Sequence, residues 1–275
     1  MLRVRDERNG AKVSRDPVTA PGLAEMKARG EKISVLTAYD YHWARMIDEA
    51  DIDVALVGDS LGMVVLGYET TLQVTLDDMI RHTAAVARGA KRALVVADMP
   101  FMSYQICDSD AVRSAGRLVS EGGAEAVKLE GGRAYEGAVR RIVDAGIPVI
   151  GHLGMTPQSV LEFGGFAAQG TTPESAERIM QDALLLEQAG VRAIVLEKIP
   201  ARLAGEITRS LRIPTIGIGA GSDCDGQVLV THDILGMFER FTPPFAKKYA
   251  DVRQITLDAF KAYRSDVKEG RFPEK

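Results

Sequence analysis

The chain has 275 residues, of which 46% are apolar and 26% charged, and its formal net charge is −4. This composition is ordinary for a soluble globular protein, and it provides neither a basic surface for nucleic acid nor a polybasic patch for anionic lipid. No apolar stretch is long enough to cross a bilayer. From the charge and the apolar pattern together, we expect no nucleic acid and no membrane among the partners.

Residues 1–18 are rich in charge and lack the apolar core of a secretory signal, so we interpret them as a flexible N-terminal arm. The two cysteines, Cys107 and Cys224, form neither a metal-binding motif nor a disulfide framework. Reduced thiols of this kind are typical of cytoplasmic proteins, and we expect a cytoplasmic location.

Beyond the arm, residues 20–32 have the pattern of an extra helix, and short apolar runs then alternate with longer amphipathic stretches. The predicted strands are residues 33–38, 53–58, 93–98, 126–130, 148–152, 193–197, 213–219 and 227–231. Capping residues and terminal glycines mark the predicted helices at 75–90, 109–123 and 172–190, and the tail after residue 240 is predicted to be helical.

Alternating strands and helices imply an α/β protein with a parallel sheet. About eight such units over roughly 250 residues favour a closed (β/α)₈ TIM barrel over an open doubly wound sheet. Since no linker interrupts the pattern, we expect residues 19–275 to form a single barrel domain. The N-terminal helix should close the far end of the barrel, and the tail should be a C-terminal helical extension.

Six ionisable side chains lie at the ends of these apolar runs. A carboxylate at such a position must reach solvent or a metal, because an unpaired buried charge is costly. In a barrel the carboxyl ends of all strands meet at one mouth, whereas an open sheet gathers only those near its switch point. The sequence therefore predicts one site built from Asp59, Asp98, Lys128, Glu130, His152 and Glu197.

Asp59 and Asp98 offer the hard oxygen ligands that magnesium prefers, and Glu130 could join them through a water molecule. The chain has no cluster of cysteines or histidines, which argues against zinc. The alternative for Asp59 is a cap on the next helix or an Asx turn.

Lys128 and Glu130 are two residues apart, so both should face the barrel interior while Leu129 faces the helices. They are either an ion pair or site residues. His152 is either a hydrogen-bonded core residue or part of the pocket.

Glu197 ends its strand with no obvious cation beside it on the inward face. A carboxylate in a partly dry pocket suits a general base. The alternative is an ion pair with Arg202. Lys198 follows directly and should point outward; turned toward the pocket, it would weaken Glu197 as a base.

Several strings resemble the ketopantoate hydroxymethyltransferase family from about residue 18 to beyond residue 240. The most specific are GDSLGM and VADMPFMSY, joined by AVKLEGG, PVIGHLGMTPQS and IPTIGIGAGSDCDGQVLVTHDILG. The resemblance implies a barrel of the phosphoenolpyruvate/pyruvate superfamily, a cytoplasmic enzyme of pantothenate biosynthesis, and a homodecamer of two pentamers. It also implies Mg²⁺ and the co-substrate 5,10-methylenetetrahydrofolate. One departure is Lys198, where the family suggests a small or apolar residue.

By resemblance, the metal ligands are Asp59 and Asp98, with Glu130 as a third acidic position. The 2-oxo acid 3-methyl-2-oxobutanoate is expected to contact Asp59, Ser60, Asp98 and Lys128, with His152 in the pocket. Glu197 matches the proton acceptor.

The implied reaction is magnesium-assisted enolate formation followed by transfer of a hydroxymethyl group. One alternative is a magnesium-dependent lyase of the same barrel type, although neither cysteine lies in the stretch expected of such lyases. The other is a catalytically inactive barrel kept as a binding module, which would lack one or more of the six residues.

Overall fold

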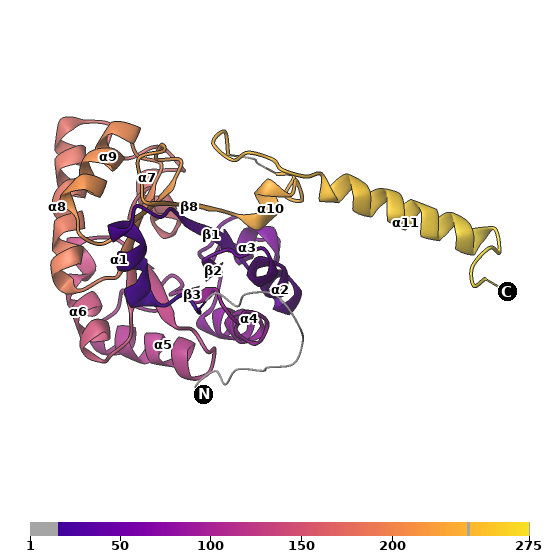
Figure 1. Cartoon of the computed structure of the whole chain (residues 1–275), viewed down its shortest axis with the longest axis horizontal. Helices are drawn as coiled ribbons and strands as arrows, with labels where there is room; N and C mark the ends of the chain where they lie inside the picture. The colour runs from indigo at the N-terminus through magenta and orange to yellow at the C-terminus, as the bar shows by residue number, and fades with distance from the viewer. Residues whose placement is uncertain (1–15, 241–242, 275) are drawn as a thin grey trace. The chain divides into compact units, whose positions relative to one another are not determined.

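The computed structural model describes residues 16–240 and 243–274 of the chain, and its eight strands form a closed barrel in sequence order (Figure 1). Neighbouring strands from the first to the eighth pair in parallel. The strands are β1 (Ile33–Thr37), β2 (Val54–Val57), β3 (Leu94–Asp98), β4 (Ala126–Glu130), β5 (Val149–Gly154), β6 (Ala193–Glu197), β7 (Thr215–Ile218) and β8 (Gly226–Leu229). The predicted TIM barrel is confirmed.

Helices lie between most of the strands. They are α1 (Ala20–Ala28), α2 (Tyr41–Glu49), α3 (Leu61–Val64), α4 (Leu76–Gly89), α5 (Asp108–Ser120), α6 (Glu136–Asp144), α7 (Val160–Phe163), α8 (Pro173–Ala189), α9 (Ala201–Ser210), α10 (Thr231–Ile234) and α11 (Val252–Lys268), with short 3₁₀ turns at Arg133–Tyr135 and Pro157–Ser159. The helices predicted at 75–90, 109–123 and 172–190 match α4, α5 and α8. Thr75 forms the expected cap and makes a capping box with Asp78.

The described chain divides into two compact units, one ending at Val228 and the other starting at Leu229. The first contains the barrel strands and the helices up to α9. The second contains α10 and α11, and α11 has no buried residue. The expectation of one domain over 19–275 stays a prediction, as does the N-terminal arm, whose residues 1–15 lie outside the described part. No helix in the described part of the chain is long and apolar enough to span a membrane.

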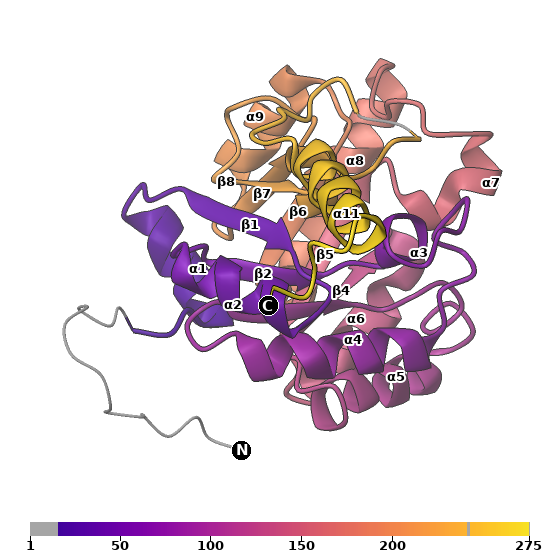
Figure 2. The same cartoon turned by 90° about the vertical axis from the view of Figure 1, so that its right-hand side faces the viewer.

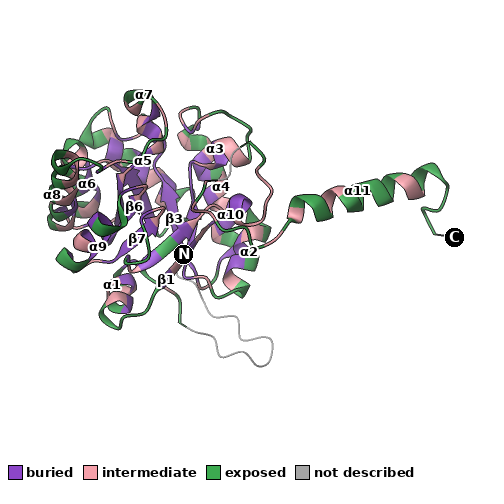
Figure 3. Ribbon diagram, turned by 90° about the horizontal axis from the view of Figure 1, so that it is seen from above, coloured by how far each residue is buried: buried purple, intermediate pink, exposed green. Residues whose placement is uncertain are grey.

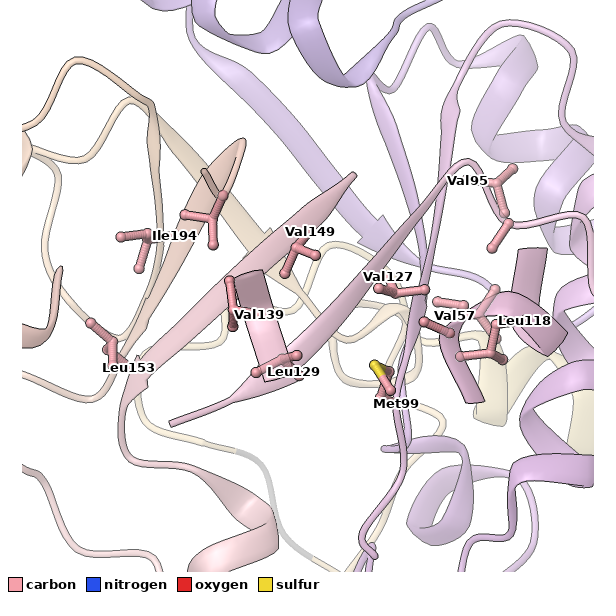
Figure 4. Packing of buried hydrophobic residues seen from close by; sticks show 14 of the residues in the cluster. Val57, Val95, Met99, Leu118, Val127, Leu129, Val139, Val149, Leu153 and Ile194 are labelled. Carbon is pink, nitrogen blue, oxygen red and sulfur yellow. The ribbon is translucent and has the colours of Figure 1, made fainter. Parts of the chain in front are cut away.

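The larger apolar cluster lies between the strands and the surrounding helices. Val127 and Leu129 of β4 point into it and pack with Leu118 of α5 and Val139 of α6 (Figure 4). Alternate residues of the same strand therefore face the interior of the barrel, as predicted for Lys128 and Glu130. Figure 3 shows the strands buried beneath helices whose outer faces are exposed.

A second apolar cluster fills the barrel from its amino-terminal end. Leu23 and Met26 of α1 pack there with the residues that begin the strands, such as Ile33 and Leu94. The Thr19 hydroxyl caps α1 by accepting a hydrogen bond from Gly22 N at 3.2 Å. In Figure 2, α1 lies beside β1 and β2. The predicted role of this helix as a closure is confirmed.

Candidate active site

The predicted site residues lie at the carboxyl ends of neighbouring strands. Asp98 is the last residue of β3, Glu130 of β4 and Glu197 of β6. Asp59 lies two residues after the end of β2 at Val57, and His152 lies in β5. The exposed fractions of Asp59, Asp98, Lys128, Glu130 and His152 are all between 2% and 5%. The structure thus brings together side chains that are far apart in the sequence.

The backbone of Asp59 is hydrogen-bonded to the side chain of Asp98. The Asp59 N–H donates to Asp98 Oδ2 at 3.0 Å. Gly58 leaves room for the Ser60 hydroxyl, because a Cβ at residue 58 would lie 2.7 Å from Ser60 Oγ. Ser60 occupies the N-cap position of α3, where no side chain makes a capping hydrogen bond. The alternative that Asp59 caps the following helix is therefore wrong.

Lys128 forms an ion pair with Asp98, with Nζ 3.0 Å from Oδ1. The sequence left open an ion pair between Lys128 and Glu130. Glu130 instead pairs with His152. Glu130 Oε1 lies 3.4 Å from His152 Nδ1. On the other side of the same ring, His152 Nε2 lies 3.4 Å from Glu197 Oε2.

The surroundings of Glu197 correct one expectation from the sequence. We expected no cation on its inward face, yet His152 Nε2 reaches Glu197 from β5, the strand that pairs with β6. Arg202 does not pair with Glu197; it bonds Glu206 at 2.8 Å. Lys198 has a left-handed backbone with φ of 46° and donates to Phe166 O at 2.7 Å, so its charge is used outside the pocket.

The acids at the mouth outnumber the bases beside them. Burial, followed by the charges of Asp98 and Glu130, raises the pKa of Asp59 well above its usual range. Burial also raises the pKa of Asp98, although Lys128 and the Asp59 N–H favour its charged form. Burial alone would raise the pKa of Glu130, but His152, Lys128 and a backbone N–H lower it.

Burial acts on the pKa of the two bases in the opposite direction, but the neighbouring acids outweigh it. Burial would lower the pKa of Lys128, but the charges of Asp98, Glu130 and Asp59 raise it, so the lysine is held as an ammonium. Burial and Lys128 would lower the pKa of His152, but Glu130 and Glu197 raise it to about 9. His152 Nδ1 is also 3.3 Å from Lys128 Nζ and cannot accept from it while donating to Glu130. The two flanking carboxylates favour the protonated ring.

Sequence reasoning missed Gln158 and two buried tyrosines. Gln158 Nε2 donates to Asp59 Oδ2 at 2.8 Å, and Gln158 Oε1 accepts from the Tyr104 hydroxyl at 2.9 Å. The Tyr39 hydroxyl is 2.9 Å from Ser60 Oγ. All three lie in loops or turns that follow a strand, and the sequence pattern does not predict what the residues of such a loop contact. The signal at hand was that Gln158 and Tyr104 fall inside the strings PVIGHLGMTPQS and VADMPFMSY.

Asp59 and Asp98 fit a divalent cation. Burial, together with the charges of Asp98 and Glu130, raises the pKa of Asp59, and a magnesium ion would supply positive charge that favours the carboxylate. Residues 16–240 and 243–274 contain no preformed group of three or more His, Cys, Asp or Glu side chains. Magnesium does not need one, since it binds through one or two carboxylates, with substrate oxygens and water completing its shell.

Comparison with known proteins gives a consistent result. The family model described as ketopantoate hydroxymethyltransferase matches residues 17–275. A curated protein of Acetivibrio thermocellus named 3-methyl-2-oxobutanoate hydroxymethyltransferase is 59% identical over 94% of this chain and 91% of its own length. A protein of the same name from Moorella thermoacetica is 58% identical over 95% of this chain and 97% of its own length.

Solved structures with the same fold are much more distant in sequence. Phosphonopyruvate hydrolase in complex with oxalate and Mg²⁺ superposes with a TM-score of 0.62 at 11% identity, covering 92% of this chain and 88% of that one. The 2,3-dimethylmalate lyase, described as a PEP mutase/isocitrate lyase superfamily member, has a TM-score of 0.59 at 17% identity, covering 94% and 90%. At these identities the similarity concerns the fold.

Proposed function

Because this chain belongs to the ketopantoate hydroxymethyltransferase family and is therefore a transferase, we propose that its reaction is that of a 3-methyl-2-oxobutanoate hydroxymethyltransferase. The enzyme would remove the C3 proton of 3-methyl-2-oxobutanoate and transfer a hydroxymethyl group from 5,10-methylenetetrahydrofolate. The product is 2-dehydropantoate, an intermediate of pantothenate and coenzyme A biosynthesis. The observation that carries the proposal is the buried excess of acid at the barrel mouth, with Glu197 beside it.

Asp59 and Asp98 would hold the magnesium ion, and Glu130 would act on it from a greater distance. When bound, magnesium supplies Lewis-acid chemistry that favours loss of a proton next to a 2-oxo group. Lys128 would neutralise charge on the substrate carboxylate, since its burial among acids keeps it an ammonium. Ser60 would donate a hydrogen bond to the substrate, with Tyr39 fixing its hydroxyl.

Glu197 would take the C3 proton of the substrate. It is partly buried, and its Oε2 faces His152 rather than a fixed lysine or arginine. The imidazole would hold the carboxylate in one orientation, and it would contact the bound substrate. Lys198 would leave the base undisturbed, because its Nζ is engaged with Phe166 O.

The remaining parts of the proposal rest on family membership. They are the use of a folate co-substrate, assembly into a homodecamer of two pentamers, and a cytoplasmic location. A lyase of the same barrel type and a catalytically inactive barrel fit less well. The family match covers nearly the whole chain, and all six strand-end positions carry residues competent for the chemistry.

The test is proton exchange at C3 of 3-methyl-2-oxobutanoate in deuterated water, followed by NMR with and without Mg²⁺. Exchange should require magnesium and should fall roughly 10²- to 10⁴-fold in Glu197→Gln. The matched control is Glu206→Gln, which changes a glutamate on α9 that pairs with Arg202. Normal exchange in Glu197→Gln would exclude this residue as the base, and cleavage of a carbon–carbon bond without folate would indicate a lyase.

A further inference from the structure

Gln158 is a buried side chain that links the segments following three strands. Its backbone N–H donates to Glu130 Oε2 at 2.9 Å. Its side-chain Nε2 donates to Asp59 Oδ2 at 2.8 Å and to Met99 O at 2.9 Å. The residue lies in the 3₁₀ turn Pro157–Ser159 after β5, and 6% of it is exposed. One residue therefore touches two of the three acids at the mouth.

The orientation of the Gln158 amide is fixed from its other side. Its Oε1 lies 2.9 Å from the Tyr104 hydroxyl and accepts from Gln105 Nε2 at 3.1 Å. On the opposite side, Nε2 faces Asp59 Oδ2 and Met99 O, which can only accept, so a flipped amide would turn its oxygen toward two acceptors. The NH₂ group is thus held against the Asp59 carboxylate.

The contacts divide the acid oxygens by task. Asp59 Oδ2 is occupied by Gln158, which leaves Asp59 Oδ1 for a cation. Glu130 has protein neighbours on both oxygens, since Oε2 accepts from Gln158 N and Oε1 lies 3.4 Å from His152 Nδ1. Asp98 Oδ2 accepts from Asp59 N, but Asp98 Oδ1 has only the Lys128 ion pair and no hydrogen bond, so Asp98 keeps an oxygen for the cation. Glu130 therefore reaches a cation best through a water molecule.

We propose that Gln158 is a positioning residue for the divalent cation, orienting Asp59 as a one-oxygen ligand and holding Glu130 outside direct coordination. This inference rests on the proposed function, which puts the cation at Asp59 and Asp98. It assigns Gln158 a role through other residues, with no contact to the substrate required. Residues that orient ligands in this way typically change metal affinity 10- to 100-fold when replaced.

The experiment measures Mg²⁺ binding by calorimetry in the full-length enzyme without substrate, together with thermal unfolding in EDTA. Gln158→Met keeps the length of the side chain and removes the oxygen and the NH₂ group of the amide. It should weaken Mg²⁺ binding roughly 10- to 100-fold. The matched control, Gln105→Met, removes a single bond to Gln158 Oε1 and leaves both donors of the Gln158 amide in place. It should change the affinity by less than about threefold, below the range for replaced orienting residues.

A second variant tests the same role without changing Gln158. Tyr104→Phe removes the hydroxyl that fixes the amide, so it should weaken Mg²⁺ binding by a smaller factor than Gln158→Met. The Tyr104 hydroxyl also bonds the backbone O and N of Glu130, each at 3.2 Å. The two effects should therefore be less than additive, and the double variant should be only slightly weaker than Gln158→Met alone. If Gln158→Met does not fold, this prediction for Tyr104→Phe against Gln105→Met still decides the matter.

Unchanged Mg²⁺ affinity in a folded Gln158→Met protein would overturn the inference, as would equal weakening in Gln105→Met. A loss of thermal stability with unchanged affinity would show a purely structural role and would also overturn it. Failure of the wild type to bind Mg²⁺ would overturn both this inference and the magnesium part of the proposed function. Normal Mg²⁺ binding with no C3 exchange would count against the proposed function alone.

Discussion

At the amino-terminal end of the barrel, Asp53 and Asp225 each have a dedicated base, whereas at the carboxyl-terminal end three buried acids share one lysine and one histidine. Asp53 bonds Arg92 at 2.9 Å and accepts two further hydrogen bonds from Ser34. Lys27 of α1 lies 3.0 Å from Asp225 and also donates to two carbonyl groups. These pairs connect α1 to the segment before β8, and the segment before β3 to the segment before β2.

This difference in charge pairing indicates different roles for the two ends of the barrel. Charges that are fully matched by partners, next to the apolar cluster around α1, offset one another and leave no demand for a ligand. Charges that are left in excess are costly and are tolerated where a ligand supplies what is missing. In barrels of this kind the carboxyl-terminal face carries the active site, and the other face serves stability. The comparison can be tested by altering each end separately.

The largest expected effect comes from Asp98→Asn at the mouth. It should lower turnover roughly 10³-fold or more, because it removes a ligand from a metal whose Lewis-acid effect is worth several kcal/mol. Steady-state kinetics over a range of Mg²⁺ concentrations check this. Thermal unfolding in EDTA should show a protein that still folds, because Glu130 and Asp59 continue to favour the charged form of Lys128. Unchanged turnover would remove Asp98 from the proposed metal site.

Lys128→Met should destabilise the protein by about 3–5 kcal/mol, since it removes the ammonium partner of buried Asp98. Urea unfolding in EDTA at neutral pH gives the free energy of unfolding. The loss should shrink at low pH, where the mouth acids become protonated. A change below about 1 kcal/mol, the size typical of surface ion pairs, would mean that the cluster is solvated and that the contrast between the two ends is false.

Leu23→Ala probes the opposite end, where the leucine of α1 is 2% exposed within the inner apolar cluster. We expect a loss of about 2–4 kcal/mol in the free energy of unfolding from the cavity created. Turnover per folded molecule and KM should stay near wild-type values, as kinetics at a temperature well below unfolding can show. A large selective fall in kcat would contradict the separation of tasks.

The smallest expected effect is a pH dependence of stability in the metal-free protein. The folded state raises the pKa of Asp59, so it binds this proton more tightly than the unfolded chain does. Stability should therefore fall as the pH rises above the ordinary aspartate value and through the raised one, by at most about 1.4 kcal/mol per pH unit.

Urea unfolding in EDTA over a pH series measures this slope, and Asp59→Asn should flatten it. Saturating Mg²⁺ should reverse the loss in the wild type, because a ligand that binds the folded state stabilises it. A wild-type slope that Asp59→Asn leaves intact would assign the titration to another group.

The barrel and the elements that supply the site could be predicted from the sequence. Alternating strands and helices imply a parallel sheet, about eight such units favour a closed barrel, and the alternation within β4 places Lys128 and Glu130 inward and Leu129 outward. Because closure brings every strand end to one rim, Asp59 and Asp98 could be predicted to meet before any coordinates existed. Local chemistry is enough for these predictions.

The partner of each charged side chain in the site could be seen only in the tertiary structure. Lys128 bonds Asp98 rather than Glu130, and His152 lies between Glu130 and Glu197, because strand register sets these neighbours. Gln158 reaches the acids from a turn after β5, and the path of such a turn depends on what packs around it rather than on any period in the sequence. Periodicity fixes which way a strand residue points, but a loop has no period, so its contacts appear only when the whole chain is folded.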